Sequence, residues 1–123
     1  MKHSLLGKMA VGELVKRFVA IALDQSEALL EGDHAKYNRL YGEMDAVEEE
    51  LQSRSGDQRR ALIPLHAHPN AQVRLKSAIA TLALTPEAAQ RTLQTMSDRD
   101  EYPQAAYARD MLAALEKGRV IPR

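Results

Sequence analysis

The chain has 123 residues, of which 45% are hydrophobic and 28% are charged. This balance is that of a globular domain and excludes a disordered chain. The 17 basic and 17 acidic residues cancel, which argues against a general polyanion binder, because such proteins neutralise many phosphates with Lys and Arg. Residues 1–55 carry 7 basic and 10 acidic side chains (−3), and residues 56–123 carry 10 and 7 (+3).

Cysteine is absent from the sequence, which excludes disulfides and thiolate chemistry. The longest apolar run, Phe18 to Leu23, is too short to span a membrane or to form an ordinary signal-peptide core. We therefore expect a cytoplasmic protein that does not associate with membranes.

Two helices are predicted in the first half of the chain. The first spans about Val11 to Leu30 and ends before Gly32. Asp33 then offers an N-cap for a second helix, about His34 to Ser53, whose apolar residues recur at helical spacing along one stripe. That stripe consists of Tyr37, Leu40, Tyr41, Met44, Val47 and Leu51.

A third and a fourth helix follow a turn at Ser55 and Gly56. Asp57 caps the third helix, Gln58 to about Ala67, which Pro64 should bend. The fourth, Ala71 to Leu84, is apolar almost all round, so we expect it to be buried on two sides.

The last two helices are framed by prolines. Thr85-Pro86-Glu87 begins a fifth helix that runs to about Met96 or Ser97, with Thr as the cap. Pro103 opens a sixth, which stops at Gly118. The prediction is an all-α single domain, 1–123. It has three stacked antiparallel hairpins, one in 11–55 and two in 57–118, and a tail at 119–123.

The apolar positions of the third and fourth helices recur in the fifth and sixth. Leu62 and Leu65 correspond to Leu93 and Met96 at an offset of 31, and Val73 and Leu82 correspond to Ala106 and Leu115 at an offset of 33. A weak repeat of this length is typical of stacked helical hairpins.

The first copy resembles a HEAT repeat, and the resemblance implies an α-solenoid fragment. It rests on Leu62-x-x-Leu65, Pro69, Val73-Arg74, Ala78 and Leu82, whereas the second copy has Tyr107 in place of the arginine. Residues 56–62 running into His68-Pro69-Asn70 also resemble a family of short bacterial proteins known only as a domain of unknown function. Neither resemblance implies a catalytic residue. HEAT-like units imply a surface for protein or nucleic-acid partners, but a fold does not fix a function.

Four residues are the candidate binding residues: Arg59, Arg60, Asn70 and Arg74. Arg59 and Arg60 lie in the first turn of a predicted helix, where arginine forks and free backbone N–H groups together can hold an anion. The simpler interpretation, which we prefer, is that Arg74 pairs with an acid or carbonyl of the adjoining hairpin. In that case Arg59 and Arg60 only cover the surface.

Other polar groups are given structural interpretations. His66 and His68 point apart on a helix, so we read them as solvated turn histidines rather than metal ligands. The run Glu48 to Glu50 fits a solvated face. Tyr37 and Tyr41 fit hairpin packing better than base stacking, since no basic residues interleave with them.

The sequence thus predicts a protein-interaction module, an adaptor or an inhibitor of another protein, with no catalytic activity, cofactor or metal. The alternative is a nucleic-acid-binding helical repeat that uses Arg59, Arg60 and Arg74 in the +3 half. A third possibility is an enzyme whose site is built from dispersed residues. The sequence does not indicate the oligomeric state.

Overall fold

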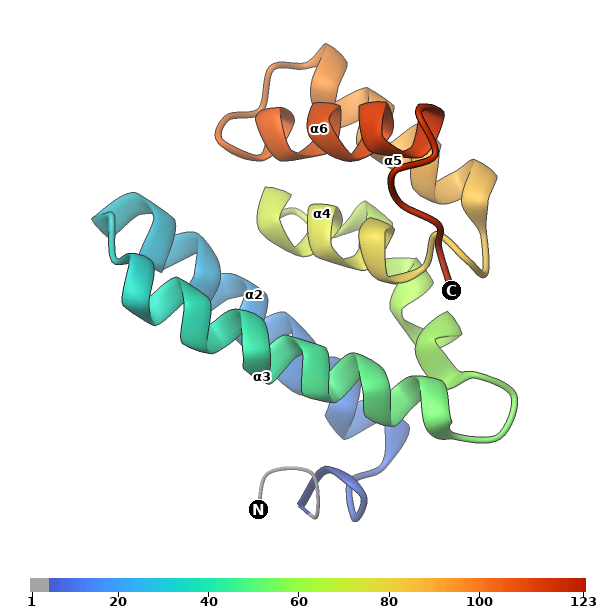
Figure 1. The fold of residues 1–123 in the computed structure, drawn as a ribbon. Coiled ribbons are helices and arrows are strands. Elements are labelled where there is room, and N and C mark those ends of the chain that lie inside the picture. The colour runs from blue at the N-terminus through green and yellow to red at the C-terminus, as the bar shows by residue number, and fades with distance from the viewer. Residues whose placement is uncertain (1–4) are drawn as a thin grey trace. The chain divides into compact units, whose positions relative to one another are not determined.

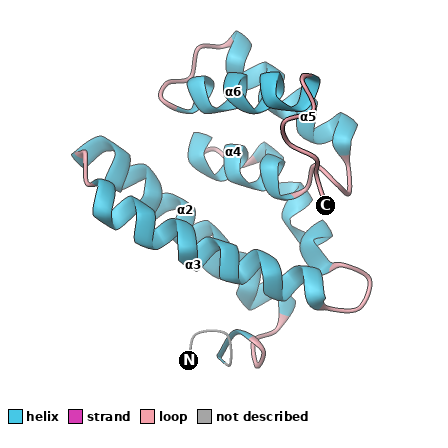
Figure 2. Ribbon diagram, viewed as in Figure 1, coloured by secondary structure: helices cyan, strands magenta, loops and turns pink. Residues whose placement is uncertain are grey.

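The computed structural model describes residues 5–123, and its elements are shown in Figure 1. They are α2 (Val11–Glu31), α3 (His34–Ser53), the 3-10 helix η1 (Gln58–Ala67), α4 (Ala71–Ala80), α5 (Pro86–Asp98) and α6 (Gln104–Glu116). The described residues form helices and no strand (Figure 2), which confirms the all-α prediction.

The chain divides into two compact units at the boundary between Ala61 and Leu62. The first unit contains α2, α3 and the start of η1, and the second contains the rest of η1 with α4, α5 and α6.

The first unit is an antiparallel hairpin whose two amphipathic helices share one apolar seam (Figure 1). Phe18 and Leu14 of α2 are fully buried, as are Val47 and Leu51 of α3. Near the open end of the hairpin, the Arg54 guanidinium donates to the Leu6 carbonyl at 3.0 Å and to Glu50 at 2.9 Å. These bonds attach the segment before α2 to the end of α3.

The turn between α2 and α3 follows the prediction from sequence. Gly32 adopts the left-handed conformation, φ 69°, which only glycine adopts without a steric penalty. Its N–H and that of Asp33 bond to the last carbonyls of α2. The Asp33 carboxylate then accepts from the Lys36 N–H at 3.0 Å and caps α3.

The second unit has its own hydrophobic core, formed where α5 packs against α4 and α6. Its fully or nearly fully buried members come from all three helices and from the turn after α4: Leu75, Ala78, Leu82, Ala89, Leu93, Met96 and Ala108. A buried amide pair also joins α4 to α6, since Gln104 donates to Gln72 Oε1 at 3.0 Å.

The third predicted helix differs from expectation in type. We expected a bent α-helix over 58–67, and the structure has a 3-10 helix with Pro64 inside it. Proline has no N–H to donate to the residue four positions before it, which interrupts an α-helical ladder. The bonds Arg60 N–H to the Asp57 carbonyl and His68 N–H to the Leu65 carbonyl are of the i to i−3 kind.

The fourth helix ends earlier than predicted, at Ala80 instead of Leu84. The Thr81 hydroxyl donates back to the Ser77 carbonyl at 2.8 Å, and the chain then continues in turns to Leu84. A hydroxyl that bonds to the preceding turn competes with the helical backbone pattern. Within the helix, Val73 and Leu75 point in different directions and are both buried, whereas Ala83 beyond it is exposed.

Two predicted helix starts also need correction in detail. Pro86 is the first residue of α5, but the Thr85 side chain makes no capping bond. Pro103 precedes α6, which begins at Gln104. Among the helices of the described residues, none is both long and apolar enough to cross a membrane.

Replacing Leu82 with alanine should destabilise the protein by about 2–5 kcal/mol, because the side chain is 3% exposed and belongs to the core of the second unit. The matched control is Leu30→Ala, whose side chain is 85% exposed and which should change stability by less than about 0.5 kcal/mol. Urea unfolding of both variants measures the difference. Equal losses would contradict the assigned burial.

Candidate functional site

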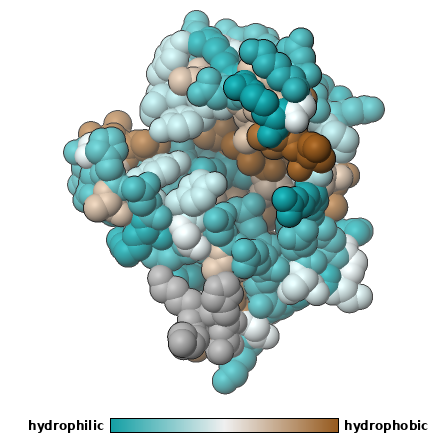
Figure 3. Space-filling view, viewed as in Figure 1, coloured by the Kyte–Doolittle hydropathy of each residue, from teal (hydrophilic) through white to brown (hydrophobic). Residues whose placement is uncertain are grey.

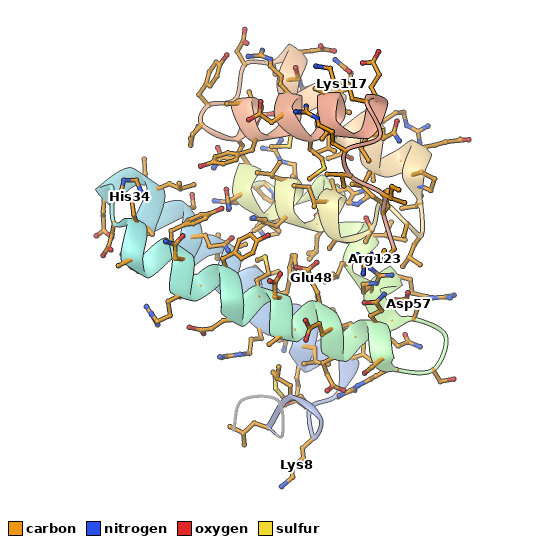
Figure 4. The ribbon with its side chains drawn as sticks, in the orientation of Figure 1. Lys8, His34, Glu48, Asp57, Lys117 and Arg123 are labelled. Carbon is orange, nitrogen blue, oxygen red and sulfur yellow. The ribbon has the colours of Figure 1, made fainter. Side chains whose placement is uncertain are left out.

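Arg59 and Arg60 wrap the loop that connects α3 to η1. Arg59 is 9% exposed and forms a two-pronged pair with the Asp57 carboxylate, at 2.9 Å from Nε and 2.7 Å from Nη2. Arg60 is exposed and donates to the Gly56 carbonyl at 2.6 Å. Figure 4 labels Asp57 in this loop. Both arginines thus hold the turn. The expectation that they only cover the surface is wrong, since Arg59 is buried in an ion pair and Arg60, although exposed, bonds to the backbone of the loop.

The ion pair between Arg59 and Asp57 shifts the pKa of both groups. Hydrogen bonding from Arg59 lowers the pKa of the Asp57 carboxyl, and the same bonds raise the pKa of the arginine. Glu48, labelled on α3 in Figure 4, adds to the favourable field at Arg59. Arg59 therefore has a fixed internal carboxylate partner.

Asn70 and Arg74 lie together in the second unit, at the start of α4. The Asn70 side-chain oxygen accepts from the N–H groups of Gln72 and Val73, at 2.8 and 3.1 Å. It is the N-cap of α4, and this explains its place in the sequence without a ligand.

Arg74 links three segments of the second unit. Its Nη1 and Nη2 lie 2.9 and 2.7 Å from the two Glu101 carboxylate oxygens, just beyond the end of α5. Its Nε donates to the His68 carbonyl at 2.8 Å, and Nη2 approaches the Pro69 carbonyl at 3.4 Å. The predicted pairing of Arg74 with an acid of the adjoining hairpin is confirmed by Glu101, while the two carbonyl acceptors belong to the hairpin of Arg74 itself.

The two histidines are part of the hydrogen-bonding framework, which corrects the expectation of solvated turn side chains. His66 is half-buried, and its Nε2 lies 2.9 Å from the Thr81 hydroxyl. Because that hydroxyl donates to Ser77, His66 is the donor in this bond. The His68 Nδ1 accepts from the Asn70 N–H at 3.0 Å.

His66, His68 and Arg74 border a groove of about 710 Å³ that lies entirely within the second unit, whereas Arg59, Arg60 and Asn70 are not part of its lining. One wall is the second half of η1 with the following turn, and the other wall is α5. The lining residues are Ile63, His66, Ala67, His68, Pro69, Arg74, Ala88, Arg91, Thr92, Thr95, Met96 and Arg99. This lining contains three arginines and two histidines but no carboxylate.

The cationic wall of the groove was missed by sequence reasoning. Arg91 and Thr95 of α5 and the C-cap residue Arg99 follow one another at four-residue intervals and so lie along one side of the helix. Both arginines are exposed, and their side chains make no hydrogen bond or ion pair to the part of the chain that the structure describes. The sequence signal for this wall was the four-residue spacing of Arg91, Thr95 and Arg99. Leu93 and Met96 mark the buried side of α5, so residues with that spacing share an outer side of the helix.

The groove has two distinct ends. Glu101 pairs with Arg74, and Arg99 helps to lower the pKa of that carboxyl after the larger effect of hydrogen bonding from Arg74. Arg74 and Arg99 therefore lie at the same end. Arg91 lies eight residues earlier on α5, about 12 Å away at the rise of an α-helix. Positive charge is present at both ends.

A family model described as "Domain of unknown function (DUF2019)" matches residues 12–116. The chain belongs to this family. The crystal structure of the protein RPA1889 from Rhodopseudomonas palustris matches with a TM-score of 0.93 at 38% sequence identity, covering 96% of this chain and 98% of that chain. A search of curated proteins gave no match.

The described part of this DUF2019 chain contains no group of three or more His, Asp or Glu side chains that could hold a metal ion.

Tyr41, for which hairpin packing was expected, is 50% exposed, whereas Tyr37 is half-buried. The acidic neighbour Asp45 and partial burial raise the pKa of Tyr41. Neither tyrosine belongs to the lining of the groove. The groove itself, with its arginines and histidines, is the candidate functional site of the second unit.

Glu101→Gln should cost about 1.5–3 kcal/mol, since it removes a charge-assisted, two-pronged partner of a mostly buried arginine. The pKa of Glu101 is lowered in the folded state, so its stabilisation is present above pH 4.5 and is lost as the pH falls below it. The variant should lack this part of the acid-induced loss of stability. Denaturation between pH 6 and pH 3 measures it, and an unchanged acid profile would contradict the pairing.

His66 should make stability depend on pH in a higher window. Burial lowers its pKa from 6.5, so the folded state resists protonation that the unfolded chain accepts. The stabilisation is complete above pH 6.5 and declines as the pH falls below that value. Thermal melts from pH 7.5 to 5.5 should show this decline in the parent chain and a flatter profile in His66→Asn. Parallel profiles would rule out His66 as the source.

Proposed function

We propose that this DUF2019 protein is a protein-interaction module that captures an acidic segment of a partner in the groove between η1 and α5. The observation that carries the proposal is the lining: three arginines and no carboxylate around about 710 Å³. Arg74 is already paired with Glu101, but Arg91 and Arg99 are exposed and have no ion-pair partner in the described residues. Such arginines favour a carboxylate-bearing ligand through charge-assisted hydrogen bonds.

The arginines of the groove have separate tasks. Arg74 is already neutralised by Glu101, so it mainly fixes the shape of one end. Arg91 and Arg99 are exposed and have their guanidinium donors available for a ligand. An incoming carboxylate would meet preplaced charge on a helix, and neither arginine would have to break an ion pair in order to bind.

A peptide fits this groove better than a nucleic acid. No Phe, Tyr or Trp belongs to the lining, so unpaired bases would find no aromatic platform on which to stack. One wall places the apolar residues Ile63, Ala67 and Pro69 beside two histidines, and the apolar residues suit side chains of a protein segment. The chain as a whole has no net charge, unlike a protein that depends on many phosphate contacts.

A module of this kind needs no catalytic group or cofactor, and none is part of the proposal. The absence of cysteine and of a long apolar run in the sequence fits a cytoplasmic setting. An adaptor that displays a groove, or an inhibitor that occupies a partner's acidic segment, would use the same contacts.

The proposal predicts that a random-peptide library selected on the parent protein will be enriched in Asp and Glu. The double variant Arg91→Gln/Arg99→Gln should retain the enriched peptides at least about fivefold less well, the loss expected for two exposed charge contacts. Arg39→Gln/Arg119→Gln is the matched control, because it removes the same charge from exposed sites outside the groove.

Equal retention by the groove variant and the control variant would contradict the proposal. Fluorescence anisotropy with single-stranded oligonucleotide at about 50 and 200 mM salt tests the alternative, since phosphate contacts make affinity fall steeply with salt. Tight, strongly salt-dependent oligonucleotide binding that is lost in Arg91→Gln/Arg99→Gln would replace the peptide with a nucleic acid as the ligand.

A further inference from the structure

The two walls of the groove differ in chemistry, and this difference restricts the segment that it can accept. The α5 wall presents Arg91, Thr95 and, at the C-cap of the helix, Arg99. The η1 wall presents the apolar side chains of Ile63 and Ala67 beside His66 and His68. From the contrast we infer that the ligand is an extended segment with alternating chemistry: acidic residues at positions i and i+4, and apolar residues at i+1 and i+3. This inference rests on the proposed function and deepens it.

The spacing along α5 sets the acidic positions. Eight residues of α-helix separate Arg91 from Arg99, which corresponds to about 12 Å at 1.5 Å per residue. Four residues of an extended chain span about 13 Å, and side chains at i, i+2 and i+4 point to the same side. Carboxylates at i and i+4 therefore reach the two arginines, and a small polar residue at i+2 meets Thr95.

The apolar wall sets the positions between them. Ile63 and Ala67 are four residues apart on a 3-10 helix, which is about 8 Å. Side chains at i+1 and i+3 of an extended chain are about 7 Å apart and point away from the acidic side. The two walls therefore match the two faces of a single extended strand.

The walls also run in the same direction along the groove, as this match requires. Arg74 bonds to the His68 carbonyl at the end of the η1 wall and to Glu101 just beyond the end of the α5 wall. Ile63 thus lies toward the Arg91 end, and Ala67 lies toward the Arg99 end.

Three synthetic peptides with the same flanking glycines and serines test the inference by isothermal titration calorimetry on the full chain. The alternating peptide has the core Glu-Leu-Ser-Leu-Glu, the rearranged peptide has Leu-Leu-Ser-Glu-Glu, and the neutral peptide has Gln-Leu-Ser-Leu-Gln. The alternating peptide should bind about tenfold more tightly than either of the others, because only it pairs both carboxylates and buries both leucines.

The apolar wall is tested separately with Ala67→Glu, which places a carboxylate on that wall at an exposed position. This substitution should lower the affinity for the alternating peptide at least about fivefold. Ala83→Glu is the matched control, since Ala83 is an exposed alanine outside the groove lining, and it should bind like the parent protein.

The outcomes separate this inference from the proposed function. Equal binding of the alternating and rearranged peptides, with both weakened by Arg91→Gln/Arg99→Gln, would overturn the alternation and leave acidic-segment capture standing. Equal binding by Ala67→Glu and Ala83→Glu would likewise overturn the role of the apolar wall. Binding of the neutral peptide as tightly as the alternating one, or binding unaffected by Arg91→Gln/Arg99→Gln, would overturn both.

Discussion

The bidentate pair between Arg74 and Glu101 is the interaction on which the candidate site depends. It joins the first turn of α4 to the loop after α5, and the same guanidinium holds the carbonyl groups of His68 and Pro69. One side chain therefore fixes the end of both walls of the groove. Because Glu101 neutralises the charge of Arg74, the positive charge available to a ligand must come from other residues.

Those residues are on α5, a helix whose inner face is anchored by the core of the second unit. Leu93 and Met96 are buried in the core. Arg91 and Arg99 lie on another side of the helix and line the groove. Packing of the inner face thus sets the spacing of the outer charges. Because the core already holds this helix in place, the protein does not have to order its backbone there when a ligand binds.

Periodicity and capping chemistry predicted most of the fold. The hairpin of α2 and α3 was predictable because Gly32 and Asp33 are unambiguous stop and start signals next to long amphipathic stripes. The shortened α4 was not, since its end depends on the Thr81 hydroxyl, which bonds to Ser77 and to His66. Such tertiary contacts leave no trace in a local pattern.

The site was predicted only in part. Of the four predicted residues only Arg74, singled out by its place in the HEAT-like pattern, lines the groove. Asn70 caps α4 and is not part of the lining. Arg59 was predicted together with Arg60 as an anion site, but its partner is the Asp57 carboxylate. Asp57 lies two residues before Arg59, in the turn, and itself has a positive φ. Arg91 and Arg99 became notable only when folding placed η1 opposite α5, a juxtaposition that no sequence spacing encodes.

The most direct test of the central claim is an NMR titration that follows the arginine Nε–H signals of the whole chain while the acidic Glu-Leu-Ser-Leu-Glu peptide is added. The account predicts that the Arg91 and Arg99 signals shift and saturate together, while those of Arg60 and Arg39, exposed arginines outside the groove, stay in place. Uniform shifts across all four arginines, or shifts confined to Arg60 and Arg39, would contradict it.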